Sequence, residues 1–272
     1  MLTDRLLTDV TAAVREAVAL EVLPRRQRLG AHEVFHKAGP HDLVTVADRA
    51  VEAHLTAALT ALLPGSLVVG EESVHTEPAR YAALDGDAWV WIVDPIDGPR
   101  HFVAGGPEFS TLVALARDGE VVASWTYAPV LDRLATAHRG AGAYLDGVRL
   151  RPGPRAAGPL RIAYSRPDRA DARQRRLLAG LQHGGPDGVQ ARRTGSAGLE
   201  YLAVARGELD AVVYAWEAAW DHAAGQLLVA EVGGVTRTLD GSAYRLRGGN
   251  ALPFVCARDE ATARRVRAVL DG

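Results

Sequence analysis

The apolar pattern of this chain changes at a Pro- and Gly-rich segment, residues 152–159. Before the segment, strand-like runs separated by Gly-containing turns predict an antiparallel meander, with strands at 110–117, 120–128, 133–138 and 142–145. After it, strands alternate with helices, which is typical of an α/β layer: strands at 160–164, 189–193, 209–214 and 253–257, helices at 168–181, 196–206, 221–232 and 260–270. We therefore expect an N-terminal α+β part, residues 1–151, and a C-terminal α/β part, residues 152–272.

Amphipathic helices are predicted ahead of the meander, over residues 2–23 and 46–63. Apolar side chains recur in both segments at steps of three and four residues. Short buried strands are expected at 67–69 and 89–93. Each of these strands runs directly into acidic residues, and the ends of strands are where α/β proteins place their sites.

The composition excludes several classes of protein. Apolar residues make up 48% and charged residues 24% of the 272 residues, which are ordinary globular values. The 31 basic and 33 acidic residues nearly balance, so a nucleic-acid or membrane partner is not expected. No apolar run reaches the ~18 residues of a membrane helix, and the single cysteine, Cys256, excludes a disulfide framework. We expect a cytoplasmic protein that acts on a small molecule.

The densest group of reactive residues is Asp94-Pro95-Ile96-Asp97-Gly98, directly after strand 89–93. Its carboxylates are three residues apart, with a proline fixing the backbone between them. Carboxylates this close repel each other unless a proton or a cation lies between them. A hard divalent cation prefers such oxygen ligands. The alternative interpretation is an ordinary turn, because Asp, Pro and Gly all favour turns.

Further acidic residues occupy comparable places. Gly70-Glu71-Glu72-Ser73 follows strand 67–69, and Trp220-Asp221-His222 opens a predicted helix. Each has a local alternative, since acidic residues stabilise helix N-termini and Asp221 would serve as an N-cap. Taken together, three acidic clusters at strand ends or helix starts favour one shared metal site over three coincidences.

These motifs, in this order, resemble those of the inositol monophosphatase family of magnesium-dependent, often lithium-sensitive phosphatases. The resemblance is carried by Asp94-Pro95-Ile96-Asp97-Gly98 together with Trp220-Asp221-His222-Ala223-Ala224-Gly225. It is supported by the stretch from Lys37 to Asp48 and by residues 70–73, 195–197 and 231–234, so that it spans nearly the whole chain.

The resemblance implies a layered α-β-α-β-α sandwich, usually a homodimer, with two or three Mg²⁺ ions per chain. One ion would be held by Glu71, Asp94 and the backbone carbonyl of Ile96. A second would lie among Asp94, Asp97 and Asp221, and a third, weaker ion would share Glu71. Glu71 would help to deprotonate the attacking water, with Asp48 behind it, and no covalent phospho-enzyme is implied.

The resemblance also implies a phosphate-binding turn at Gly98, Pro99 and Arg100. The family usually has threonine after the glycine, and its hydroxyl orients the attacking water. Proline at 99 removes that hydroxyl and one backbone N–H. Losing one positioned donor commonly lowers a rate by a factor on the order of 10²–10³. Arg100 would compensate if its guanidinium bound the phosphate oxygens.

Other residues fall where the family contacts its substrate: Lys37, Ser165, Gly195, Ser196 and Ala197. A family glutamate that holds an inositol hydroxyl aligns with Tyr214, and Glu217, three residues on, is a possible substitute. His101 and His222 flank the acidic clusters. Because these metals prefer oxygen ligands, we expect both histidines beside the metal site or at the surface.

The sequence therefore predicts a Mg²⁺-dependent phosphomonoesterase that hydrolyses the phosphate ester of a small polyol, a sugar or a related metabolite through metal-activated water. Within the family, the resemblance leaves inositol phosphate, histidinol phosphate, fructose bisphosphate and nucleotide 3′-phosphates open as substrates. The alternative from another class is a catalytically weakened member that binds a phosphorylated ligand or a protein partner. Pro99 favours that alternative, whereas the intact acidic set argues against it.

Overall fold

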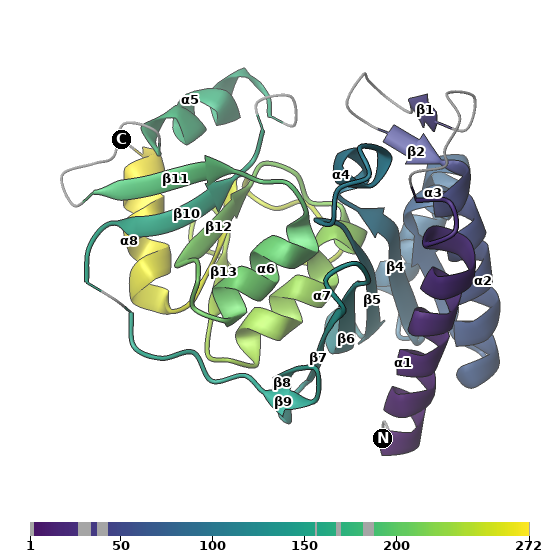
Figure 1. Ribbon diagram of the computed structural model, residues 1–272. Helices are drawn as coiled ribbons and strands as arrows, with labels where there is room; N and C mark the ends of the chain where they lie inside the picture. Colours follow the sequence, from purple (N-terminus) through teal and green to yellow (C-terminus); the bar gives the residue numbers. More distant parts are fainter. Residues whose placement is uncertain are drawn as a thin grey trace.

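Two sheets stack between three layers of helices, in the order α-β-α-β-α (Figure 1). The computed structural model describes residues 3–26, 34–36, 43–155, 157–166, 170–181 and 188–271. The expected layered sandwich is therefore confirmed. No helix in these ranges is both long and apolar enough to cross a bilayer.

The larger sheet has seven strands in the order β3-β4-β5-β6-β7-β8-β9. Its members are β3 (Leu67–Gly70), β4 (Val90–Asp97), β5 (Ser110–Arg117), β6 (Glu120–Ala128), β7 (Arg133–His138), β8 (Gly142–Leu145) and β9 (Val148–Arg149). β3 and β4 are parallel and every other pair is antiparallel. Asp118-Gly119 and Asp146-Gly147 all have positive φ, which two-residue hairpin turns require. The predicted meander is confirmed, and the short β9 was missed.

The N-terminal helices cover one face of this sheet (Figure 1). α1 (Asp4–Ala17) continues into a π-helical turn at Val18–Val22, and α2 spans Val46–Leu62. Both predicted helices are thus confirmed. Their apolar stripes pack against Trp91, Val93 and Trp125 of the sheet. Between them in the chain lies the small antiparallel pair β1 (Val34–His36) and β2 (Leu43–Thr45).

The smaller sheet has five strands in the order β11-β10-β12-β14-β13. Its members are β10 (Leu160–Tyr164), β11 (Val189–Arg193), β12 (Ala211–Tyr214), β13 (Val235–Arg237) and β14 (Phe254–Ala257). β10 is parallel to β11 and β12, and β14 is antiparallel to its neighbours. Because β13 is only three residues long and half-buried, the apolar pattern did not reveal it.

The remaining helices complete the layers. α6 (Ala197–Ala205) and α7 (Ala219–Ala230) lie between the two sheets, and α5 (Ala172–Gly180) and α8 (Glu260–Asp271) cover the outer face of the smaller one. The short elements are α3 (Glu71–Thr76), the 3₁₀ helix η3 (Pro78–Asp85) and α4 (Pro99–Val103). One apolar cluster joins β5, α6, α7, β12 and β14. The two predicted parts therefore share a core, and a boundary near residue 152 stays a prediction.

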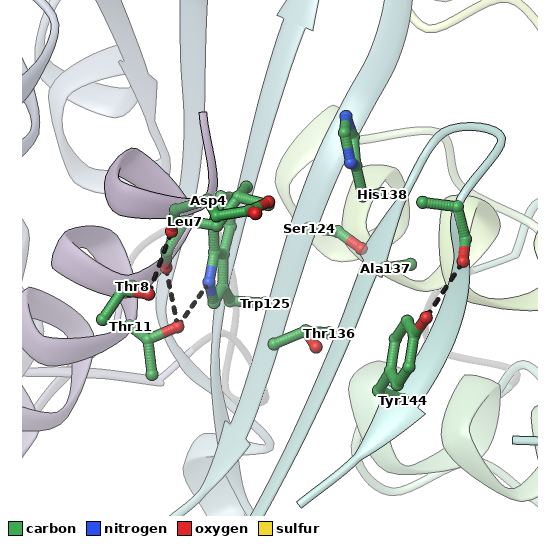
Figure 2. A pocket seen from close by; sticks show the side chains of 11 residues that line it. Asp4, Leu7, Thr8, Thr11, Ser124, Trp125, Thr136, Ala137, His138 and Tyr144 are labelled. Atoms are coloured by element: carbon green, nitrogen blue, oxygen red, sulfur yellow. Dashed lines mark hydrogen bonds between the residues drawn. The ribbon is translucent and has the colours of Figure 1, made fainter. Parts of the chain in front are cut away.

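A separate cavity of about 390 Å³ lies between the start of α1 and strands β6 to β8. Figure 2 shows Thr8 and Thr11 of α1 on one side and Thr136 and His138 of β7 on the other. Trp125 Nε1 donates to Thr11 Oγ1 at 3.0 Å and ties the helix to the sheet there. None of the described residues that the sequence assigns to the active site lines this cavity.

Close contact between α6 and α7 generates a test of the central layer. A Cβ atom on Gly225 of α7 would overlap the side chain of Tyr201 on α6. We expect Gly225→Ala to lower the free energy of unfolding by roughly 1–3 kcal/mol, because overpacking outweighs the gain in helix propensity. Gly153→Ala is the control, since a Cβ there meets nothing within 4 Å. Chemical denaturation measures both, and a Gly225→Ala protein as stable as the control would contradict the packing described.

Candidate metal centre and active site

A bulge in β4 brings the two carboxylates of the Asp-Pro-Ile-Asp motif together. Asp94 pairs with Leu112 and Asp97 with Ser110, so three steps along β4 oppose two steps along β5. In a regular strand, residues three apart point to opposite faces. One extra residue in the strand reverses that relation, and both side chains then lie on the same side. The expected strand 89–93 ended too early, because β4 continues through the motif to Asp97.

Asp94 is a buried acidic side chain with an unsatisfied oxygen. It is 1% exposed, and its Oδ1 atom is buried without a hydrogen bond from any described residue. Burial raises the pKa of Asp94 well above its ordinary value, and the charges of Glu71, Asp221, Asp97 and Asp48 raise it further. A buried carboxylate with an unpaired oxygen is costly unless another group binds it. Asp94 Oδ1 is therefore available as a ligand atom for a cation.

Asp97 is fixed by the first turn of α6. Its Oδ1 accepts from Ala197 N at 2.8 Å, and its Oδ2 accepts from Gly198 N at 2.8 Å and Ser196 Oγ at 2.5 Å. Ser110 Oγ donates to the same Oδ2 at 3.0 Å. Burial raises the pKa of Asp97, and these hydrogen bonds oppose the rise. The expected substrate residues Ser196 and Ala197 thus position a carboxylate, and the N-terminus of α6 adds its dipole.

Asp221 comes from the first turn of α7 but is not its N-cap. The cap is Ala218, and the helix begins at Ala219 rather than at the predicted residue 221. Trp216 Nε1 donates to Asp221 Oδ2 at 2.9 Å, which orients the carboxylate. One oxygen each of Asp94, Asp97 and Asp221 lie within 4.8 Å of one another. The N-cap alternative is therefore wrong, and the predicted convergence of the three aspartates is confirmed.

Glu71 and Asp48 lie close enough to Asp94 for their charges to raise its pKa. Because β3 is parallel to β4, with Gly70 opposite Val93, the acidic residues that follow β3 are placed near Asp94. Asp48 closes the capping box of α2, where Thr45 N and Thr45 Oγ1 both donate to its Oδ2 at 2.7 Å. Burial raises the pKa of Asp48 to about 7, helped by the charge of Glu71.

Two buried glutamates and one tryptophan of this region were missed from the sequence. Glu52 accepts from Glu72 N and Ser73 N at the start of α3, and Glu200 binds Arg192 through both oxygens. Glu52 was detectable, because it lies four residues after Asp48 on the same helix face. Glu200 and Trp216 lie within eight residues of their partners Arg192 and Asp221, but these contacts cross irregular connections that no periodic pattern predicts.

The predicted phosphate-binding turn begins α4. Gly98 has φ of 84° and caps the helix, and Pro99 is its first residue, where a missing N–H is tolerated. A Cβ on Gly98 would lie 3.0 Å from both Glu108 O and Ser196 Cβ, so the turn also requires glycine for space. Pro99 and Arg100 are half-buried beside Gly98. Their binding of phosphate stays a prediction.

Hydrogen bonds hold two of the other expected substrate residues, Ser165 and Glu217. Ser165 Oγ accepts from Ala215 N at 2.7 Å and donates to Val213 O. Glu217 accepts from Gly249 N and from both nitrogens of Asn250. Tyr214 is fully buried, and its hydroxyl has no hydrogen-bond partner among the described residues. Their contact with a substrate stays a prediction, as does that of Gly195, and Lys37 lies outside the described residues.

The two histidines have different surroundings. His222 is fully buried, with Nε2 3.0 Å from Trp216 O and Nδ1 3.1 Å from Tyr201 Oη. A carbonyl only accepts, so Nε2 carries the proton and Nδ1 accepts from the tyrosine. His222 therefore lies beside the residue that orients Asp221. His101 of α4 has Nδ1 3.3 Å from Glu108 Oε2.

Known proteins resemble this chain in sequence and in architecture. The model of the inositol monophosphatase family matches residues 4–270. The chain belongs to the inositol monophosphatase family. The inositol-1-monophosphatase of Rhizobium meliloti is 37% identical over 236 residues, covering 85% of this chain and 84% of that relative. The Nus factor SuhB of Haemophilus influenzae is 34% identical and covers 79% and 78%. The solved IMPase of Thermotoga maritima has a TM-score of 0.81 and 26% identity, covering 99% and 97%.

The inositol monophosphatase family is metal-dependent, and the donor set fits a hard divalent cation. The candidate ligand atoms are carboxylate oxygens, the type that Mg²⁺ prefers. One of them, Asp94 Oδ1, accepts no hydrogen bond from the described residues, and three aspartates converge on one point. A phosphatase activity is plausible for this chain on both grounds.

The raised pKa values predict how the metal-free protein responds to pH. Asp48 has a pKa of about 7 in the folded state against 3.8 ordinarily. Between these values the folded protein holds a proton that the unfolded chain has released. The free energy of unfolding should therefore fall as the pH rises through this window, and Asp94 contributes with the same sign.

Thermal unfolding in chelator measures this effect. We expect a lower Tm at about pH 8 than at about pH 5, and a larger stabilisation by Mg²⁺ at the higher pH, where the ligands are ionised. Asp48→Asn keeps an acceptor for Thr45 but removes the titration, so its Tm should vary less with pH. A wild-type Tm that varies over this range no more than that of Asp48→Asn would show that Asp48 is not held protonated.

Proposed function

We propose that this protein is a Mg²⁺-dependent phosphomonoesterase of a small polyol or sugar phosphate, acting in the cytoplasm as a homodimer. The observation that carries the proposal is the unpaired Oδ1 of Asp94 in a cluster with Asp97 and Asp221. This cluster adjoins the α4 turn, because Asp97 directly precedes Gly98, the N-cap of α4. A metal site beside a helix-initiating turn suits a phosphate ester.

Asp94, Asp97, Asp221, Glu71 and the carbonyl of Ile96 would hold two or three Mg²⁺ ions. Bound Mg²⁺ would supply positive charge that polarises the phosphate and acidifies water. Asp97 is kept in place by four hydrogen-bond donors, and Asp221 by the Trp216 indole. Such fixed ligands are organised before the substrate arrives, which favours transition-state stabilisation over reorganisation.

Glu71 would accept the proton of the attacking water. It is half-buried at the first position of α3, and it interacts electrostatically with both Asp48 and Asp94. Asp48 would act on Glu71 through its charge. Its carboxyl group is held in place for this role by two hydrogen bonds from Thr45. The α4 turn would receive the phosphate, with Arg100 replacing the donors that Pro99 lacks.

The names of the relatives, rather than a pocket shaped for inositol, support the proposed substrate class. Relatives over 30% identical are named inositol-1-monophosphatase. An inositol-type ester is therefore the first substrate to test, followed by histidinol phosphate and nucleotide 3′-phosphates. Tyr214 stands where the family has its inositol-binding glutamate, and Glu217 is engaged by the backbone at 249–250, which leaves the choice of polyol open.

A second candidate function is the binding of a protein partner with little turnover. Two observations favour it. Residue 99, where the family resemblance implies a water-orienting threonine, is proline, and relatives of 32–34% identity are named Nus factor SuhB. The balanced charge gives no electrostatic ground for nucleic acid as the direct partner. Release of phosphate separates the two functions, because only the phosphatase produces it.

Asp94→Asn tests the phosphatase. The change keeps the shape but removes the charge that would be shared between cations, so we expect phosphate release to fall by at least about 10²-fold and Mg²⁺ affinity to fall with it. Asp118→Asn is the matched control, because Asp118 is an exposed turn residue. Phosphate release from an inositol phosphate with and without Mg²⁺, plus calorimetry, measures both. Unchanged Mg²⁺ affinity in Asp94→Asn would contradict the metal assignment.

Pro99→Thr tests whether the turn limits catalysis. Threonine restores a hydroxyl and an N–H at the start of α4, so we expect kcat to rise by about tenfold or more. Pro78→Thr, at the start of η3, controls for loss of a helix-initiating proline. If Arg100 has taken over the phosphate, Arg100→Ala will be the damaging change instead. No effect of either change, with no ester cleaved, would favour the partner-binding function.

A further inference from the structure

A second cavity, of about 250 Å³, adjoins the candidate active site through Ser196. Ser196 lines this cavity, and its hydroxyl donates to Asp97 Oδ2. His101 of α4 forms part of another wall. The space is far larger than the roughly 10–15 Å³ that one water molecule requires. A substrate bound at the metal centre therefore has room to extend into it.

Arginines from the ends of two parallel strands line the cavity. β10 and β11 pair in parallel from Leu160 and Val189 to Tyr164 and Arg193, so their carboxyl ends lie side by side. Arg166 follows β10, and Arg192 and Arg193 end β11. We call this cavity the arginine pocket. Carboxyl ends of parallel strands are the usual location of ligand sites in α/β layers.

Two guanidinium groups of the arginine pocket are fixed without being neutralised. Arg166 Nε donates to Thr194 O at 3.2 Å, and Arg193 Nη1 donates to Ser165 O at 3.1 Å. Arg193 also stacks over the ring of Tyr164, 4.4 Å from its centroid. Neither arginine forms an ion pair with a described carboxylate. Carbonyl and ring contacts orient a guanidinium but leave its charge uncompensated.

The acidic residues of the pocket have other partners. Glu200 is engaged by Arg192, with both of its oxygens within 2.8 Å of a guanidinium nitrogen, and Glu108 lies beside His101. The pairing of Arg192 with Glu200 cancels both charges. The remaining cations, Arg166 and Arg193, are both half-buried. Guanidinium groups in such positions are suited to bind a phosphate through paired N–H donors.

We propose that the arginine pocket binds a second phosphate group of the substrate. The proposal rests on the proposed function, because the first phosphate would lie at the metal centre. It narrows the substrate class from monophosphates, in which the rest of the molecule is uncharged, to small molecules that carry two phosphates. Arg166 and Arg193 are then specificity-determining residues, and a neutral polyol would leave their charges unmatched.

Matched substrates test the proposal. Alkanediol bisphosphates of increasing chain length are compared with the monophosphates of the same diols, in the presence of Mg²⁺. We expect kcat/KM to favour the bisphosphate by about tenfold or more at the length that spans both sites. Arg166→Gln and Arg193→Gln should lower kcat/KM for that bisphosphate by a similar factor and leave the monophosphate unchanged. Arg173→Gln, on the exposed face of α5, is the charge control.

A binding measurement separates this proposal from the proposed function. In chelator, the metal centre offers phosphate no cation, so calorimetric titration with inorganic phosphate reports on the arginine pocket. We expect wild type and Arg173→Gln to bind phosphate and the two pocket variants to lose it. If no ester is cleaved but this pattern is found, the proposed function fails and the pocket stands.

Other results would overturn the proposal. One is equal kcat/KM for mono- and bisphosphates at every chain length in an active wild-type enzyme. Another is an equal loss on both substrates in the pocket variants, which would show a structural role. A third is the absence of phosphate binding in chelator. The wild-type comparisons decide the question even if a variant fails to fold.

Discussion

Mutual repulsion among buried carboxylates is the constraint on which this structure depends. Asp94 is almost fully buried, and the charges of its acidic neighbours add to the penalty of removing it from water. In a low-dielectric interior such charges are tolerated only when they are protonated, paired or bound to a cation. Hydrogen-bond donors satisfy Asp97 and Asp48, but none from the described residues reaches Asp94 Oδ1. Among these carboxylates, Asp94 Oδ1 is thus the oxygen that a bound cation would stabilise most.

The layers of the fold serve to bring the carboxylates to that atom. The bulge in β4 places Asp94 and Asp97 on one side, and the parallel pairing of β3 with β4 adds Glu71. Helices from the C-terminal part supply the rest, because α6 anchors Asp97 and α7 carries Asp221. A site assembled across both parts explains why α6 and α7 pack directly against the larger sheet. It also places the arginine pocket, on the smaller sheet, next to the metal centre.

Contiguous motifs and periodic segments could be predicted from the sequence. Strands such as 110–117 and 120–128 were placed at their observed bounds, because alternation and Asp-Gly turns are local signals. The aspartates at 94, 97 and 221 were found because their neighbours mark strand and helix ends. Contacts between distant segments could not be predicted. The reciprocal bonds of Arg166 and Arg193 arise only when β10 and β11 lie side by side. The bond from Trp216 to Asp221 spans only five residues, but it crosses an irregular connection that no periodic pattern predicts.

The location of the cation is the central claim, and anomalous diffraction tests it most directly. Crystals of the protein would be grown with Mn²⁺, which takes octahedral oxygen sites like those of Mg²⁺. The account predicts an anomalous peak from a Mn²⁺ ion that is bound by Asp94 Oδ1, Asp97 and Asp221, at metal–oxygen distances of about 2.1 Å. Well-ordered crystals in saturating Mn²⁺ with no peak among these three aspartates would contradict it.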